Sequence, residues 1–154
     1  MDVFNFFSPN ISKELETHLK GQPDDKINSL EEIRIRANRP IILKFNDEEK
    51  IIDYLITTED ILETLQIICE NSIYSYQNQI CNGYITIKGG HRVGISGNCV
   101  IEKNRVVNIN YISSLNFRIA RQVIGCSNKI LKYILKTEEN NIYNTIIISP
   151  PGAR

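Results

Sequence analysis

With 154 residues and a mass of 17.7 kDa, the chain is long enough to bury a sizeable core in one compact domain and too short for two full ones. Its 42% hydrophobic and 23% charged residues exclude a disordered, collagen-like or largely coiled-coil protein. Eighteen basic residues balance eighteen acidic ones, so the chain as a whole lacks the positive charge that would draw it to nucleic acid or anionic lipid.

The sequence carries no targeting or metal-binding signal. No basic stretch precedes a long apolar core at the amino terminus, and no apolar run reaches the roughly 18 residues that a membrane span needs. The cysteines lack Cys-x-x-Cys spacing and clustered histidines, so we expect no metal site and interpret them as thiols of a reducing cytoplasm. They are Cys69, Cys81, Cys99 and Cys126.

The first elements in chain order are a helix and three strands. Ser8 is the expected N-cap and Pro9 the first residue of a short amphipathic helix, which Gly21 terminates. After a polar turn, runs of apolar residues interrupted by turn residues predict a β-hairpin and a third strand. These strands are expected at residues 30–36, 41–45 and 50–56.

Two helices are expected next. Thr57-Thr58-Glu59-Asp60 has the pattern of a capping box with an acidic first turn. Residues 72–81 predict a further helix. The apolar residues that follow the capping box fall on one helical face: Ile61, Leu62, Leu65, Ile68 and Cys69.

The middle of the chain predicts a meander of short antiparallel strands, and the last part a helix and a strand. A helix is expected to begin at Ser127, and the apolar run 146–148 predicts a buried strand of parallel type. The strands of the meander are expected at residues 83–87, 92–96, 99–102 and 105–109, with a further extended segment at 113–121.

The end of the sequence has two interpretations. Ser149, Pro150, Pro151 and Gly152 fit the opening of a G-x-x-x-x-G-K-[ST] phosphate loop that follows a buried strand, with Ser in the first place. Arg154 stands where the second glycine belongs, and the lysine and hydroxyl residue that contact phosphate and magnesium are not in the sequence. The alternative is a strand that leaves into an ordinary turn.

The densest basic feature is Arg34-x-Arg36-x-x-Arg39. In a strand, Arg34 and Arg36 point to one face while Ile33 and Ile35 point to the other, so one face is cationic. Guanidinium groups suit phosphates and carboxylates, which makes these arginines candidates for docking another domain. The alternative is a solvated face on which they pair with nearby acids, namely Glu31, Glu32 and residues 47–49.

Residues 89–97 hold four glycines and the pair His91-Arg92. A phosphate cradle would precede a helix, whereas strand-like residues follow here. The glycines also suit a tight hairpin with positive φ or close backbone contact. A third interpretation places His91 and Arg92 at an interdomain surface, where they act in trans. Arg118 and Arg121 form a second, smaller basic set.

No constellation for catalysis within the chain is present. His18 and His91 lie in unrelated contexts, no Gly-x-Ser-x-Gly elbow occurs, and no paired carboxylates stand out. The residues therefore favour a binding module over a self-contained enzyme.

Four motifs occur in an order that resembles the stage III sporulation protein AA family. The resemblance covers nearly all of this chain but only the first half of a full member, which continues through a complete Walker A loop, a Walker B strand and a RecA-like core related to secretion and pilus ATPases. The motifs are Glu32-Ile33-Arg34-Ile35-Arg36-x-x-Arg39-Pro40, Gly89-Gly90-His91-Arg92-Val93-Gly94, Leu115-Asn116-Phe117-Arg118-Ile119-Ala120-Arg121 with Gly125-Cys126, and Ile148-Ser149-Pro150-Pro151-Gly152.

The resemblance implies an α/β fold of the α+β kind in two parts. Residues 1–120 are expected to form a two-layer amino-terminal domain with a mixed or antiparallel sheet and helices. Residues 121–154 are expected to form the linker, first helix and first strand of a RecA-like core that breaks off in its Walker A loop.

The resemblance also implies a nucleotide site shared between domains. In related secretion ATPases, arginines of the amino-terminal domain and linker approach the nucleotide phosphates, which makes Arg92, Arg118 and Arg121 candidates for phosphate or interdomain contacts beside Ser149–Gly152. ATP and Mg are the cofactors of the full-length family. This chain, without the loop lysine, the Ser/Thr ligand and a Walker B carboxylate, is expected to bind neither and to have no ATPase activity.

The implied role is the amino-terminal regulatory and oligomerisation part of an ATPase that powers or assembles the channel between mother cell and forespore. Its implied partners are its own ATPase core, neighbouring subunits of a hexamer and other stage III sporulation proteins at the membrane. The implied place is the mother-cell cytoplasm, peripheral to the forespore membrane.

A different function class stays open beside this one. The strand with Arg34, Arg36 and Arg39 is also compatible with a module that binds protein or nucleic acid and has no connection to an ATPase. Zero net charge and the absence of aromatic residues among these arginines count against nucleic acid, which we do not expect as a partner.

Overall fold

The computed structural model describes residues 2–46, 48–121, 125–136 and 141–149 of the chain. The chain forms two compact units, Met1–Ala120 and Arg121–Arg154. The first contains a six-stranded sheet, its helices and the hydrophobic core, and the described residues of the second contain one short helix and two short strands.

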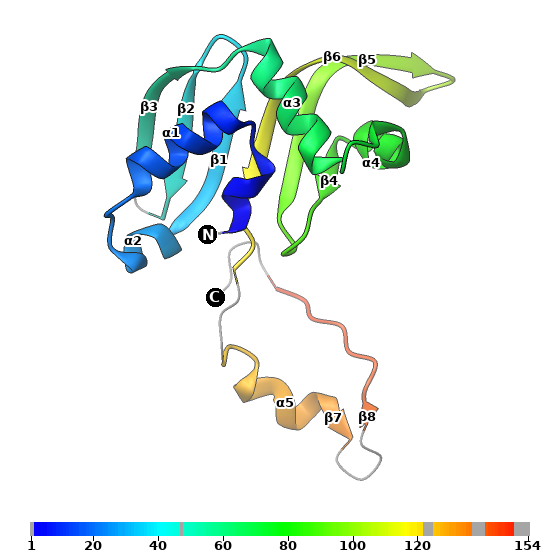
Figure 1. Ribbon diagram of the computed structural model, residues 1–154. Helices are drawn as coiled ribbons and strands as arrows, with labels where there is room; N and C mark the ends of the chain where they lie inside the picture. The colour runs from blue at the N-terminus through cyan, green and yellow to red at the C-terminus, as the bar shows by residue number, and fades with distance from the viewer. Residues whose placement is uncertain (1, 47, 122–124, 137–140, 150–154) are drawn as a thin grey trace. The chain divides into compact units, whose positions relative to one another are not determined.

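The first unit has two layers. Its strands form one antiparallel sheet in the order β3-β2-β1-β6-β5-β4, and helices α1 and α3 lie over one face of it (Figure 1). This confirms the predicted two-layer α+β fold. The sheet was expected to be mixed or antiparallel, and it is antiparallel. The strands are β1 (Leu30–Arg36), β2 (Pro40–Phe45), β3 (Glu49–Leu55), β4 (Tyr84–Thr86), β5 (Arg92–Glu102) and β6 (Arg105–Arg118), and the helices are α1 (Pro9–Leu19), α2 (Asp24–Asn28), α3 (Thr58–Ile68) and α4 (Gln77–Cys81), with 3-10 helices at Asp2–Phe6 and Ile73–Tyr76.

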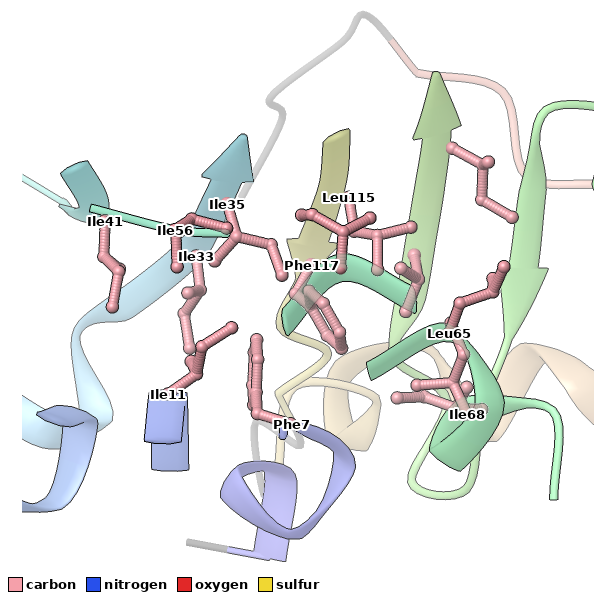
Figure 2. Close-up of a cluster of buried hydrophobic side chains, with 14 of the residues drawn as sticks. Phe7, Ile11, Ile33, Ile35, Ile41, Ile56, Leu65, Ile68, Leu115 and Phe117 are labelled. Atoms are coloured by element: carbon pink, nitrogen blue, oxygen red, sulfur yellow. The ribbon is translucent and has the colours of Figure 1, made fainter. Parts of the chain in front are cut away.

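The core lies between the sheet and these helices. Successive strand residues point to opposite faces, so Ile33 and Ile35 of β1 and Leu115 and Phe117 of β6 turn toward the helices, where Figure 2 shows them above side chains of α1 and α3. Phe7, just before α1, packs on Phe117 with ring centroids 4.1 Å apart. All five side chains are at most 2% exposed, so the amino-terminal segment closes the core beside α1.

A buried carboxylate joins α1 to α3. Asp60, in the first turn of α3, accepts hydrogen bonds of 3.0 Å from Ser8 Oγ, Tyr54 OH, and both the backbone nitrogen and the hydroxyl of Thr57. Burial opposes ionisation, but these hydrogen bonds outweigh it and hold the pKa of Asp60 below its ordinary 3.8. The carboxylate therefore stabilises the fold above pH 3.8, and its contribution is lost as the pH falls from there toward the lower folded-state pKa.

Two predicted helix caps meet at this carboxylate. Thr57 and Asp60 form the predicted capping box of α3, in which each side chain accepts a hydrogen bond from the other residue's backbone nitrogen. Ser8 precedes Pro9 at the start of α1, as predicted, but its side chain makes no cap hydrogen bond. The Ser8 hydroxyl donates to Asp60 instead, so a residue predicted to act within one helix links two.

The predicted antiparallel meander forms, with β4, β5 and β6 as successive neighbours, but its middle consists of two long strands rather than several short ones. β5 and β6 pair along their lengths around a turn at Lys103 and Asn104, whose φ angles of 48° and 61° suit a two-residue hairpin. The register shifts at Gly97, where a Cβ would meet the backbone oxygen of Asn110 at 2.7 Å. The breaks in the sequence pattern are therefore a turn and β-bulges inside one ladder. β1 pairs with β6 only over residues 114–118, so the hairpin continues beyond the rest of the sheet as a two-stranded ribbon (Figure 1).

Three smaller differences concern helices. Residues 72–81 form a 3-10 helix followed by α4 rather than one predicted helix, and α2 begins within the polar turn predicted at residues 21–25. Leu62, predicted on the buried face of α3, is 46% exposed. The buried face follows Ile61, Leu65 and Ile68, and Leu62 lies one residue around the helix from it.

The second unit contains α5 (Asn128–Ile134), which follows Ser127 as predicted, and the pair β7 (Leu135–Lys136) and β8 (Asn141–Ile142). The predicted strand at Ile146, Ile147 and Ile148 does not form, and these side chains are 86%, 75% and 92% exposed. A strand needs a neighbour for its backbone groups, and the described strands pair with other residues. No helix among the described residues is long and apolar enough to cross a membrane.

We expect Asp60→Ala to lower the free energy of unfolding by about 2–4 kcal/mol, because Ser8, Tyr54 and Thr57 would lose their shared buried acceptor. Urea denaturation measures the change. Asp53→Ala is the matched control, since Asp53 is exposed and its loss should change the free energy by about 0.5 kcal/mol at most. Equal effects of the two substitutions would contradict a special role of Asp60.

We expect Gly97→Ala to destabilise the first unit by about 1–3 kcal/mol, because the new methyl group would press on the Asn110 backbone oxygen. Gly94, three residues earlier in β5, is the control: a Cβ there meets its nearest neighbours at 3.8 Å, an ordinary contact, so Gly94→Ala should be nearly neutral. Thermal denaturation of the two variants tests the difference, and a tolerated Gly97→Ala would show that the bulge can relax.

Candidate functional site

The face of the sheet away from α1 and α3 carries the polar strand residues, and we call it the open face. Residues directly opposite in neighbouring strands share a face, so the strand register groups these residues into rows. The first row runs through Thr86, Arg92, Arg118, Glu32 and Lys44. The other two rows run through Tyr84, Gly94, Asn116, Arg34 and Ile42, and through Ser96, Ser114 and Arg36.

Arg92 and Arg118, far apart in the sequence, are direct partners on this face. Both side chains are exposed, and neither forms an ion pair with a carboxylate of the described residues. The Arg92 guanidinium lies over the ring of Tyr84, 5.4 Å from its centroid. Like charges directly opposite in a ladder repel, and an anion between them would relieve the repulsion. Arg121, the third candidate, belongs to the second unit.

Arg34 differs from these two arginines because acids surround it. Its Nε donates to Glu32, and its Nη1 lies 3.1 Å from Glu49 Oε1. The hydrogen bond to Glu32 raises the pKa of Arg34 above its ordinary value, with further support from Glu49. For Arg34, the structure therefore shows the ion-paired arrangement that the sequence offered as the alternative to docking. Arg36 and Arg39 form no ion pair with a described carboxylate.

A hollow of about 610 Å³ lies on the open face between β1, β6 and β5. Gly94, Ser96 and Ser114 are small, whereas the β1 residues beside them carry long side chains, so the surface dips over β5 and β6. The residues around the hollow include all three arginines of the first basic motif and two outward residues of β6, Ser114 and Asn116. Its polar lining residues are Arg34, Arg36, Arg39, Ser96, Ser114 and Asn116.

Asn116 contributes an unusual group to this hollow. Its side chain is half-buried, and its Oδ1 is shielded from solvent without accepting a hydrogen bond from any described group. A buried carbonyl oxygen without a donor costs free energy, since in water it would be hydrogen-bonded. A donor on a ligand in the hollow would satisfy it once the half-buried side chain turns toward the hollow.

His91 lies in the turn between β4 and β5. Its Nδ1 accepts a hydrogen bond of 2.9 Å from the backbone nitrogen of Ala120, the last residue of the first unit. Gly89 and Gly90 have φ angles of 88° and 79°, and a strand follows, so the glycine-rich segment is a hairpin turn rather than a phosphate cradle. Within the first unit, the ring of His91 holds the end of the domain in place.

The remaining sequence candidates lie in the second unit. Ser149 is described and exposed, whereas Pro150, Pro151 and Gly152 lie outside the described residues. Among the residues that the structure describes, no three His, Cys, Asp or Glu side chains cluster as a metal site would require.

Sequence reasoning did not single out the polar residues that complete the open face. Ser96, Ser114 and Tyr84 belong to no motif that pointed to a role, and Asn116 lies in the motif at residues 115–121, which assigned it none. The available signal was an alternation along β6. Polar Ser114, Asn116 and Arg118 alternate with buried Leu115 and Phe117, which places the polar side chains on the outward face of this strand.

We expect the His91 ring to titrate below its ordinary pKa of 6.5, because burial disfavours the charged form and protonation would remove the acceptor for Ala120. The folded state then binds a proton less readily than the unfolded state. The contribution of neutral His91 to the free energy of unfolding should be fully present above pH 6.5. It should decrease as the pH falls from 6.5 toward the folded-state pKa. NMR titration of the ring and urea denaturation at several pH values test this, and His91→Gln should abolish this part of the pH dependence.

Comparisons with known proteins place the chain in a family. The family model described as "Sporulation stage III, protein AA" matches residues 2–154. The chain is 35% identical over 141 residues to stage III sporulation protein AA of Bacillus subtilis (strain 168), a match that covers 92% of this chain and 45% of that protein. The chain thus spans about half the length of this curated relative.

Among solved structures, the VirB11 ATPase of the Brucella suis type IV secretion system in complex with sulphate matches with a TM-score of 0.42 and 10% identity, over 77% of this chain and 32% of that one. The family match and the Bacillus relative confirm the resemblance that the four motifs indicated. The chain belongs to the sporulation stage III, protein AA family.

Proposed function

We propose that the chain is the amino-terminal regulatory and oligomerisation part of a sporulation-specific ATPase of the secretion type, which powers or assembles the channel between mother cell and forespore. Family membership supports the role in sporulation. The observation that carries the proposal is the direct pairing of Arg92 with Arg118 on the open face.

This arginine pair has the chemistry needed to contact a nucleotide across a domain boundary. Two guanidinium groups without ion-paired carboxylates among the described residues present several donors on one exposed surface. Phosphate oxygens accept such donors, and the added negative charge would offset the repulsion between Arg92 and Arg118. We therefore assign these two arginines to the phosphates of ATP, and leave magnesium to the Walker segments that the family resemblance implies.

The open face also suits the proposed partners. In the first unit, α1 and α3 cover the opposite face of the sheet (Figure 1). Charged and polar strand residues reach solvent on the open face. Such a surface fits a reversible contact with the protein's own ATPase core or with neighbouring subunits of a hexamer. Other stage III sporulation proteins at the forespore membrane, reached from the mother-cell cytoplasm, complete the proposed setting.

A nucleic-acid function receives less support from the structure. Of the three arginines that suggested it, Arg34 is neutralised by Glu32 and Glu49. No aromatic side chain is among the residues around the hollow, although stacking on such side chains is typical of proteins that bind single strands.

The experiment replaces the matching segment of the Bacillus subtilis relative with this chain and measures heat-resistant spores and ATP hydrolysis. We expect the chimera to support both. Arg92→Ala with Arg118→Ala should lower both by on the order of a hundredfold, as expected when arginines that stabilise phosphate charge are lost. Arg105→Ala removes one guanidinium group at the far end of β6 and is the control. A doubly substituted chimera that hydrolyses ATP normally would overturn the assignment.

A further inference from the structure

We propose that the hollow on the open face is a separate binding site for a small phosphate monoester that also carries hydroxyl groups. The site consists of Arg36, Arg39, Ser96, Ser114 and Asn116. It does not depend on the proposed ATPase role, because it uses neither Arg92 nor Arg118.

The size of the hollow suits a small molecule. Its volume of about 610 Å³ lies within the usual range of ligand pockets, roughly 300–1,000 Å³. Inorganic phosphate alone would leave most of this space empty, so the ligand has a body in addition to its charged group. Pro40 and Ile42 line the hollow as well and give that body an apolar surface to contact.

The charge of the hollow selects an anion. Arg36 and Arg39 are exposed and form no ion pair with a described carboxylate, whereas the guanidinium of Arg34 is occupied by Glu32 and Glu49. The hollow therefore offers two available guanidinium groups, whereas Arg34 and its two carboxylates together carry one negative charge.

The number of donors favours phosphate over carboxylate. Each guanidinium has five N–H groups, and the hydroxyls of Ser96 and Ser114, directly opposite each other across β5 and β6, add two more donors. A carboxylate is planar and is satisfied by a single guanidinium fork. A phosphate monoester has three acceptor oxygens in a tetrahedral arrangement, so it can bind both arginines and a serine hydroxyl at once.

Asn116 indicates that the ligand also carries a hydrogen-bond donor. Its Oδ1 is buried beside the arginines and serines and accepts no hydrogen bond from the described residues, so it needs a donor that an anionic group cannot provide. The Asn116 side chain is only half-buried, so a turn of its amide would bring Oδ1 to the hollow, where hydroxyl groups on the body of the ligand would donate to it. One molecule with a phosphate at one end and hydroxyls at the other satisfies both features.

The site is distinct from the arginine pair of the proposed function. Arg118 and Asn116 are two residues apart on β6, and Arg92 and Arg118 are not among the residues that line the hollow. Because different residues form the two sites, substitutions can remove one without the other.

The test measures binding of glycerol 3-phosphate, inorganic phosphate and citrate to the purified chain by calorimetry at fixed ionic strength, with amide chemical shifts to locate the site. We expect glycerol 3-phosphate to bind more tightly than inorganic phosphate and citrate, and to shift the amides of Ser96, Ser114 and Asn116. Arg36→Ala with Arg39→Ala should raise its Kd about tenfold or more, because charge-assisted hydrogen bonds are lost.

Ser96→Glu is a second variant at an exposed position that keeps the fold, and its carboxylate should repel the ligand with a similar effect. Arg105→Ala should leave the Kd within about twofold, since general charge attraction is weakly affected by one remote arginine. The proposal is overturned if none of the probes binds, if citrate binds as well as glycerol 3-phosphate, or if binding survives in both hollow variants. Loss of binding only in Arg92→Ala with Arg118→Ala would assign the ligand to the arginine pair instead, which separates this test from that of the proposed function.

Discussion

The two-residue period of the central strands is the constraint on which the rest of the first unit depends. On β1 and β6 it sends Ile33, Ile35 and Phe117 into the core and turns Arg34 and Arg118 outward. A shift of either strand by one residue would bury arginines and expose isoleucines, so the large apolar contribution to folding also fixes the position of every cation on the open face. The site is therefore specified by the core beneath it.

Much of the secondary structure followed from local patterns, and the errors have a common physical origin. The capping box at Thr57, the start of α1 at Pro9 and the hairpin of β1 and β2 depend on neighbouring residues, and the structure confirms them. Short strands were predicted where β5 and β6 run on, because the break in pattern is a bulge that only the pairing shows: residues 111–113 of β6 lie opposite Gly97 alone. The strand predicted at residues 146–148 depends on neighbours that the described residues do not supply.

The candidate site was predictable in its residue types and not in its pairings. Sequence spacing placed Arg34 and Arg36 on one face, but it could not show that Glu49 from β3 neutralises Arg34 while Arg36 forms no such ion pair. Nor could it bring Arg92 opposite Arg118, because that contact is set by the register of a long hairpin. Asn116 belongs to one of the sequence motifs, but its buried and unpaired Oδ1 is visible only in the structure.

The ribbon formed by the outer parts of β5 and β6 gives the first unit uneven local stability. Beyond the bulge its strands pair only with each other, and contacts with α4, such as the hydrogen bond from Gln77 to Asn108, hold it on one side. An isolated pair of strands is only marginally stable in water. The amide hydrogens of the ribbon, such as those near Ile101, should therefore exchange with solvent through a local opening of low free energy. The amide hydrogens of β1 should exchange only when the whole sheet unfolds. The first unit thus combines a rigid central sheet, which carries the arginines, with a two-stranded extension that can open without moving them.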